Sequence, residues 1–433
     1  MPAPGKGKDT GRTMAYVPVA LILAGMAAYT VLAGADFGAG LWMLLAGGRS
    51  TPHAPQTRAH ARHAMGPVWE ANHVWLIFVL VLCWTAYPVA FGSITSTLPI
   101  PLTAAAIGII FRGTAYALRG TTTERGASRA AENLLALSSI VSPFFLGTVI
   151  GAIAIGRVPV GNARGDIVTS WLNLPCILVG VLAVAFSGYL AAVYLAADSV
   201  RAGSPVMVRL FRRRALAAGI VSGPLALAGV LVLRHYGLEL TRPLALVMVS
   251  VSAVAGLATL ALCWLSRFEL ARLSAALAVA GVVAGWAAAQ APRMLPGMTV
   301  TQAAAGRATL VGLTIAVGCG AVILIPALAL LYSLYLRGRL DTPEAEPRAP
   351  APAVPGQPAP DQPAPAPPAP PSAGGTGTVA SAGRTRVLSG IAIAGLIAGG
   401  MLLVFTDMAW THAVGVACVL ACAVATFRLV GPD

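Results

Sequence analysis

A few ionisable side chains lie inside or beside long apolar stretches of this sequence. They are Asp36, Glu70, His73, Arg112 and Asp407. A charge at the centre of a bilayer costs roughly 2.5–3.5 kcal/mol on insertion scales, so such a charge is kept where it faces protein or water. Carboxylates and imidazoles in that position suit proton transfer, which makes these residues the first candidates for chemistry.

Asp36 lies in the glycine-rich segment Gly-Ala-Asp-Phe-Gly-Ala-Gly, residues 34–40. Three glycines around one acid permit close approach by neighbouring helices, and they allow a turn that aims the carboxylate inward. The pattern also fits an acid at a helix end that only marks the membrane interface.

Glu70 lies in the segment GPVWEANHVW, where a connection becomes an apolar stretch. Pro67 is typical of a helix start, and a carboxylate in the first turn interacts favourably with the helix dipole. His73 lies on the same helix face at i+3. Glu70, Asn72 and His73 together suit a proton-entry site, because partial burial disfavours the charged form of a carboxylate. Helix capping beside an interfacial Trp69 is the alternative interpretation.

Arg112 lies within the apolar segment that reads FRGTAYALR. A guanidinium is always charged and needs a partner there, and either Glu70 or Asp36 would serve. Snorkelling to the headgroups from the end of the helix is the other option. His73 is more typical of a hydrogen-bonded structural residue than of a haem ligand. Three further histidines are expected to be solvated in a loop: His53, His60 and His63.

The composition defines the elements that must position these residues. Of the 433 residues, 57% are hydrophobic and 10% are charged, and 47 are glycine. The mean hydropathy is +0.79. A soluble domain is about 25% charged, so a soluble enzyme is excluded. The composition predicts an all-α fold, a polytopic bundle of transmembrane helices in the lipid bilayer.

Nine stretches are long and apolar enough to span a bilayer. They are 14–35, 71–92, 97–118, 132–155, 170–196, 215–233, 243–265, 270–290 and 309–336. Residues 341–386, with thirteen prolines, are predicted to be an extended linker. Two further spans are predicted at 387–406 and 409–427, on either side of Asp407. The chain thus divides into a tail (1–13), a nine-helix core (14–340), a Pro/Ala-rich linker (341–386) and a helical hairpin (387–433).

The net charge of +14 comes mainly from arginines in the short connections. The connections 36–70, 119–131 and 197–214 and the turn with Arg267 and Arg272 are rich in arginine, whereas the alternate connections hold two at most. The positive-inside rule therefore places the N-terminus outside and the 36–70 connection and the linker in the cytoplasm. The same rule accounts for the charge without a nucleic-acid partner.

The sequence shows no motif for a metal or a nucleotide. The cysteines all lie inside apolar runs without metal-ligand spacing: Cys83, Cys176, Cys263, Cys319, Cys418 and Cys422. There is no GxxxxGK[ST], no GxGxxG that opens a helix and no CxxCH. We therefore expect no metal and no c-type haem on this chain.

The segments GADFGAG and GPVWEANHVWLI, with the Tyr87-Pro88 pair and FRGTAYALR, resemble subunit II of the cytochrome bd-type quinol oxidases over roughly residues 14–340. The resemblance implies a partner subunit I that binds haem b, haem d and quinol from the membrane pool, while this chain carries no haem. The assembled enzyme would sit in the plasma membrane and reduce dioxygen to water with cytoplasmic protons. Whether a structural quinone binds to this chain is left open.

The resemblance also implies roles for residues. Asp36 and Glu70 match the two acids of the family motifs, and with His73 they are the expected proton pathway. Three neighbours are expected as structural or charge partners: Arg112, Trp69 and Asn72. Many family members have one more acid where this chain has only Ala33, Gly34 and other non-acidic residues, and the linker and last two spans lie outside the family pattern.

Two other function classes fit the same features. A secondary transporter also has about ten spans and intramembrane acids, but its two halves should repeat their broken helices, and neither motif recurs in the second half. A scaffolding subunit would keep Asp36 and Glu70 for structure alone.

Overall fold

The structure of the protein, a computed structural model, describes residues 6–46, 53–65, 68–119 and 125–336. The linker at 341–386 and the two spans expected at 387–406 and 409–427, with Asp407, Cys418 and Cys422, lie outside these residues.

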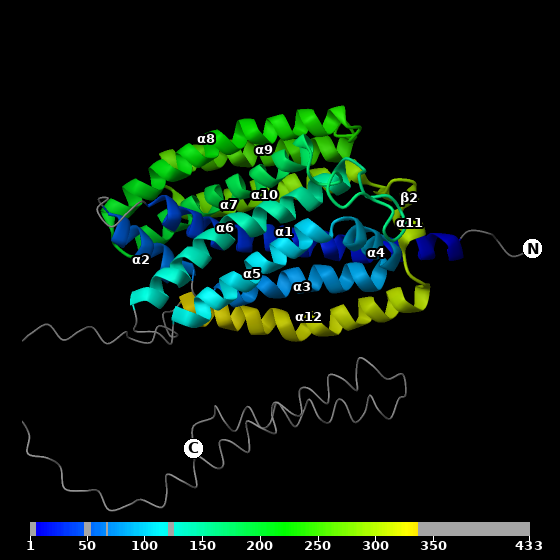
Figure 1. The fold of residues 1–433 in the computed structure, drawn as a ribbon, viewed down its shortest axis with the longest axis horizontal. Coiled ribbons are helices and arrows are strands. Elements are labelled where there is room, and N and C mark those ends of the chain that lie inside the picture. The colour runs from blue at the N-terminus through cyan, green and yellow to red at the C-terminus, as the bar shows by residue number, and fades with distance from the viewer. Residues whose placement is uncertain (1–5, 47–52, 66–67, 120–124, 337–433) are drawn as a thin grey trace, which may run out of the picture. The chain divides into compact units, whose positions relative to one another are not determined.

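The described chain is a bundle of long helices, and its longest described connection, residues 155–173, lies between α6 and α7 (Figure 1). The elements are α1 (Lys6–Leu45), α2 (Ala54–Met65), α3 (Val68–Ala86), α4 (Pro88–Thr97), α5 (Pro99–Arg119), α6 (Arg125–Ala154), α7 (Leu174–Arg201), α8 (Pro205–His235), α9 (Pro243–Trp264), α10 (Phe268–Gln290), β1 (Arg293–Leu295), β2 (Met298–Thr299), α11 (Val300–Ala303) and α12 (Arg307–Leu336). One end of the bundle, here called the α2 end, carries α2. The opposite end, here called the hairpin end, carries α4, β2 and α11 (Figure 1).

A helix lies at each of the nine ranges predicted to span the membrane. Among the described residues, seven helices are long and apolar enough to cross a bilayer, or eight if the bent pair α3–α4 counts as one span. The described apolar part of α5, Pro99–Ala115, is shorter than a full span. The chain is therefore a multi-pass membrane protein, and the count of nine spans plus two is not confirmed.

Two predicted loops are wrong because they are largely helical. The 36–70 connection contains the last turns of α1 and all of α2, so the glycine-rich segment continues a helix and makes no turn. The arginine-rich 197–214 loop is mostly the end of α7 and the start of α8. Arginine is a good helix former, and Pro205 occupies the first turn of α8, where a missing N–H is harmless.

The predicted span 71–92 is not one straight helix. The chain bends by 118° between Asn72–Ala86 and Pro88–Thr97. The bend is at Tyr87, whose backbone leaves the helical region (φ −136°, ψ 60°), as expected for a residue before proline. The Tyr87 hydroxyl donates a 2.6 Å hydrogen bond to the Ala15 carbonyl and thereby joins the bend to α1.

The expectation of an all-α fold needs one correction, at the hairpin end. Strands β1 and β2 pair antiparallel, with Arg293 opposite Thr299. Thr299 then forms a capping box with Gln302 at the start of α11. Strands this short have no periodic pattern of their own, so a sequence prediction misses them.

α7 is largely buried, and much of its sequence consists of small residues. Residues 189–193 and 195–197 are at most 4% exposed and include four alanines. Small side chains let helix backbones approach closely where lipid gives no hydrophobic driving force. α1, α6 and α8 pack around this helix. By contrast, α12 exposes large apolar side chains such as Val322 and Ile323, as a lipid-facing helix does.

Candidate functional site

A buried ion pair joins α1 to α5. The Arg112 Nε donates to Asp36 Oδ2 at 2.8 Å, and Nη2 donates to Oδ1 at 2.6 Å. Nη2 also donates to the Asp36 carbonyl oxygen at 2.7 Å. Both residues are only 1% exposed. Of the two partners expected for Arg112, the structure thus shows Asp36, and the guanidinium does not snorkel.

A third helix and an aromatic ring complete the surroundings of Arg112. Its Nη1 donates to Ser139 Oγ on α6 at 3.0 Å, and Ser139 in turn donates to the Leu135 carbonyl at 2.6 Å. The guanidinium carbon lies 5.0 Å from the centre of the Phe37 ring, a cation–π distance. Each guanidinium nitrogen therefore has an acceptor, which a buried charge requires.

The glycines around Asp36 are explained by helix contacts. A Cβ added to Gly38 would lie 1.8 Å from the Ser187 carbonyl oxygen on α7, and one added to Gly40 would lie 1.9 Å from Ser139 Oγ on α6. α1 therefore touches two neighbouring helices at the level of the ion pair. The motif brings the carboxylate into the helix interface by close packing.

The energy of such a pair depends strongly on both members being present. Moving one ion into a low-dielectric interior costs several kcal/mol, and the partner repays this only with good geometry. Removing one partner of a buried pair costs about 3–5 kcal/mol. Because both carboxylate oxygens of Asp36 accept from Arg112, binding a proton there would disrupt the pair.

Two polar side chains of α1 and α3 are buried without a hydrogen-bond partner among the described residues. They are the Tyr29 hydroxyl on α1 and both amide atoms of Asn72 on α3. Tyr29 lies two helical turns before Asp36 on the same face and interacts electrostatically with Asp36 and Arg112. α1 and α3 are in contact here, since a Cβ on Gly25 would touch Phe78 and Val79. Buried polar atoms of this kind are sites for ordered water.

The remaining predicted residues lie at the start of α3. The helix begins at Val68, so Trp69 and Glu70 are in its first turn, but their side chains are outside the described part of the structure. Asn72 is 1% exposed and His73 is half-buried. Sequence reasoning did not single out Tyr29 or Ser139. The spacing of Tyr29 seven residues before Asp36, and the hydroxyls of Ser138 and Ser139 within an apolar run, are the signals that could have found them.

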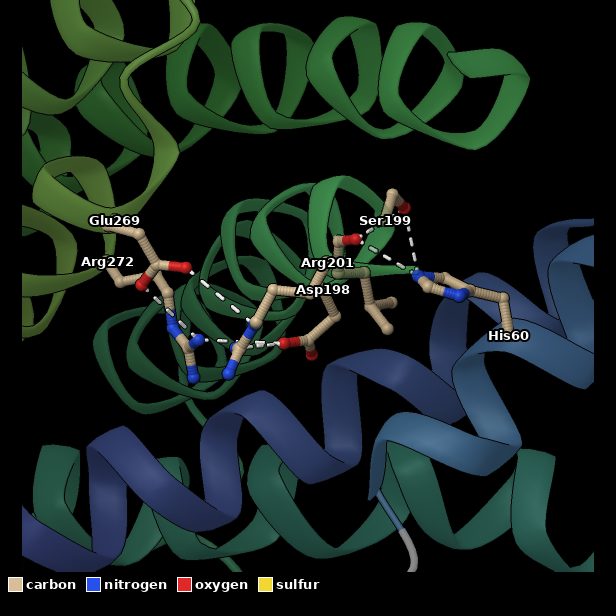
Figure 2. A network of polar contacts seen from close by, with 7 residues as sticks. His60, Asp198, Ser199, Arg201, Glu269 and Arg272 are labelled. Atoms are coloured by element: carbon tan, nitrogen blue, oxygen red, sulfur yellow. Dashed lines mark hydrogen bonds and ion pairs between the residues drawn. The ribbon is translucent and has the colours of Figure 1, made fainter. Parts of the chain in front are cut away.

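A second polar cluster lies at the α2 end (Figure 2). Ser199 Oγ donates to the Leu195 carbonyl at 2.6 Å, and His60 Nε2 lies 2.9 Å from Ser199 Oγ and 3.1 Å from Leu195 O. The tautomer with a proton on Nε2 satisfies both contacts. The prediction that His60 is solvated in a loop is therefore wrong, since it ties α2 to α7.

Acids and arginines of α7 and α10 form the rest of this cluster. Asp198 pairs with Arg201 and lies 3.5 Å from Arg272 Nη1. Glu269 contacts the same two arginines at 3.7 Å (Figure 2). These partly exposed pairs connect the helix ends and contribute little individually, about 0–1 kcal/mol each.

The described residues hold no group of three or more His, Cys, Asp or Glu that could bind a metal. The described part of the chain has cavities of about 270 and 580 Å³. The larger one, between α9 and α10, is lined by aliphatic residues with Ser250 and Ser274, and Ser274 already donates to the Ala255 carbonyl. Such a lining suits an acyl chain better than the polar ring of a quinone, so this cavity is not assigned to the quinol reaction.

The fold and the buried pair define a class: a multi-pass helical membrane protein with a charge pair in its interior. Comparison with known proteins specifies the family. The family model described as "Cytochrome bd terminal oxidase subunit II" matches residues 14–335. The chain belongs to this family, which confirms the resemblance seen in its motifs.

Two relatives support the assignment. The chain is 27% identical over 169 residues to "Cytochrome bd ubiquinol oxidase subunit 2" of Bacillus subtilis (strain 168), covering 38% of this chain and 47% of that protein. The match thus spans about half the length of the curated relative. The structure is similar to the solved bd oxidase from Geobacillus thermodenitrificans, with a TM-score of 0.62 and 24% identity over 75% of this chain and 99% of that one. This second likeness concerns the fold.

Proposed function

We propose that this chain is the non-haem subunit II of a bd-type quinol:oxygen oxidoreductase in the plasma membrane. It would support a haem-bearing subunit I, which takes electrons from the membrane quinol pool, and help to deliver cytoplasmic protons for reduction of dioxygen to water. The observation that carries the proposal is the family match over residues 14–335. The comparisons offer no support for the alternative, a secondary transporter.

The haems are assigned to the partner subunit because the described residues do not fit one. An axial ligand needs a free histidine nitrogen or a thioether facing a cavity large enough for a macrocycle. His60 is already bonded to Ser199 and Leu195 O, and neither described cavity is lined by histidine. No step through a haem is therefore placed on this chain.

The proposed proton route begins at Glu70 and continues past Asn72 and His73 toward Tyr29. Three observations support it: the position of Glu70 in the first turn of α3, and the buried, unpartnered polar atoms of Asn72 and Tyr29. Water bound to these atoms would carry protons between them. Asp36 has a different role in this proposal, because its carboxylate is paired with Arg112. It acts as a fixed charge beside the route.

The proposed orientation places the α2 end in the cytoplasm and the N-terminus outside. The one-sided arginines support it: Arg201, Arg209, Arg212, Arg213, Arg214, Arg267 and Arg272 all lie at or near helix ends that meet at the α2 end. The positive-inside rule assigns such an end to the cytoplasm. Access of a membrane-impermeant thiol reagent to a cysteine introduced at exposed Arg267, compared with one at exposed Arg164, tests this orientation.

The first test of the function is a reduced-minus-oxidised absorbance spectrum of the native complex purified through this chain. A chlorin-type long-wavelength band beside b-type haem bands, with quinol-driven oxygen uptake, is the expected result. An intact but haem-free preparation contradicts the proposal.

The proton route is tested by Glu70→Gln. Loss of a group that transfers protons lowers turnover by about 10²-fold or more, so oxygen uptake should fall while the haem spectrum and assembly remain normal. Glu269→Gln is the matched control, because Glu269 is an exposed acid at the same end and should leave turnover unchanged. If Glu70→Gln assembles and consumes oxygen at the original rate, Glu70 is only a helix cap.

The linker and the last two predicted spans are proposed as an addition to the oxidase core. This rests on the family match, which ends at residue 335. A chain truncated after residue 340 should still assemble with its partner and consume oxygen. Failure of the truncated chain to assemble shows that residues 341–433 belong to the core.

A further inference from the structure

We infer that the α2 end of α1 and α8 binds the headgroup of an anionic phospholipid, with Arg214 as the central contact. This inference concerns different residues from those of the proton route and does not depend on the proposed function.

Arg214 is held in an aromatic setting without an acid. Its guanidinium carbon lies 5.0 Å from the Trp42 ring centre on α1 and 5.2 Å from that of Phe211 on α8. Its Nη1 is buried and has no hydrogen-bond partner. The Trp42 ring is fixed by a 2.8 Å hydrogen bond from Nε1 to the Gly188 carbonyl, and Phe211 is fully buried. The guanidinium is thus packed against two aromatic rings, and no carboxylate is paired with it among the described side chains.

The surrounding charge is positive. α8 carries Arg209, Arg212, Arg213 and Arg214 within six residues and has no acid over its full length. Arg209 and Arg213 are exposed. Two acids at this end whose side chains the structure describes, Asp198 and Glu269, are already paired with Arg201 and Arg272 (Figure 2). An anion from outside the chain is therefore the natural counter-charge.

The apolar surface next to these arginines points to a lipid. Ala217, Ile220 and Val221 follow Arg213 and Arg214 on the same face of α8 at helical spacing and are exposed. Leu44 and Leu45, two and three residues after Trp42, are 47% and 57% exposed. A ligand with a phosphate at one end and acyl chains at the other matches this arrangement, whereas free phosphate would leave the apolar surface unused.

The test uses the full chain purified together with the subunits it binds. Native mass spectrometry measures retention of added phosphatidylglycerol against phosphatidylcholine, and inorganic phosphate is added separately as a competitor. Each Lys or Arg near a membrane surface contributes about 1 kcal/mol to anionic lipid binding, which is roughly fivefold in affinity. Arg214→Gln should therefore reduce phosphatidylglycerol retention at least fivefold and leave phosphatidylcholine retention unchanged.

Two more variants keep the test decisive. Arg213→Gln alters an exposed side chain that carries no packing, so it should lower retention severalfold even if Arg214→Gln fails to fold. Arg234→Gln, at the opposite end of the same helix and equally exposed, should have no effect. Equal retention in the Arg213→Gln and Arg234→Gln variants overturns the inference, as does full displacement of the lipid by millimolar inorganic phosphate. A cross-link from position 213 to a partner subunit in place of lipid overturns it as well.

Discussion

The buried pair of Asp36 and Arg112 can be tested by a double-mutant cycle. The variants are Arg112→Gln, Asp36→Asn and the combination. Arg112→Gln removes two charge-assisted hydrogen bonds to the Asp36 carboxylate, one to its carbonyl and one to Ser139. At about 1.5–3 kcal/mol for each charge-assisted bond, and with a buried carboxylate left behind, we expect a loss of ~4 kcal/mol in unfolding free energy.

Asp36→Asn should cost less, about 3 kcal/mol, because the carbonyl and Ser139 bonds to Arg112 remain. The double variant should lose ~2 kcal/mol less than the sum of the two single variants, because neither charge is then left unpaired. Unfolding free energies come from SDS titration of the protein in detergent. Ser139→Ala, which loses one hydrogen bond, is the control at about 1 kcal/mol.

A strong interaction between Asp36 and Arg112 is refuted if each single variant lowers the unfolding free energy by less than about 1 kcal/mol. It is also refuted if the double variant loses the sum of the two single-variant losses. If Arg112→Gln does not express, Arg112→Lys retains the charge without the planar fork and should give an intermediate loss. If Asp36→Asn folds with normal stability but no longer supports oxygen uptake, Asp36 belongs to the proton route.

Two further outcomes are expected. Gly38→Ala should destabilise the protein by ~3 kcal/mol or more, because the new Cβ would clash with the backbone of Ser187. Gly223→Ala is the control, since a Cβ at Gly223 has no atom within 4 Å. It should be neutral or stabilise the protein by about 0.5 kcal/mol in the same titration. In the loop between α6 and α7, backbone N–H groups of Thr169 and Val168 lower the pKa of Asp166 below its ordinary 3.8. A carboxylate whose pKa is lower in the folded protein stabilises the folded loop above pH 3.8, and this stabilisation is lost as the pH falls through the pKa of the folded state. Cleavage of the loop by an acid-active protease should therefore rise below about pH 4 in the original protein. In Asp166→Ala the cleavage should not change with pH in this range.

Local patterns predicted the helices well because long apolar runs have few alternatives in a membrane. They failed where an outcome depends on tertiary contact. The glycines around Asp36 suggested the end of a helix, yet α1 continues to Leu45, because packing on Ser187 and Ser139 stabilises the helix there. Arg112 had two possible partners in the sequence, and its contact with Asp36, 76 positions away, is set by how α1 and α5 meet.

The bend at Tyr87 shows a different kind of limit. Proline after tyrosine was visible in the sequence, but Pro18, Pro143, Pro224 and Pro326 all lie inside helices of this protein that continue past them. A proline alone therefore does not distinguish a bend from a tolerated kink. What differs at Tyr87 is the hydrogen bond from its hydroxyl to Ala15, which no local pattern records.

The bend also helps to close one end of the bundle. After it, α4 closes the hairpin end, where Tyr87, Leu98, Val158 and Leu295 have essentially no exposure. The loop after α6 is fastened onto α4, since the Gly161 and Ala163 N–H groups donate to Ser93 and Ser96 at 3.0 Å. Charged side chains such as Arg164 lie outside this layer, on the exposed surface of the same end. A closely packed layer of this kind limits the passage of water and ions through the bundle at the hairpin end.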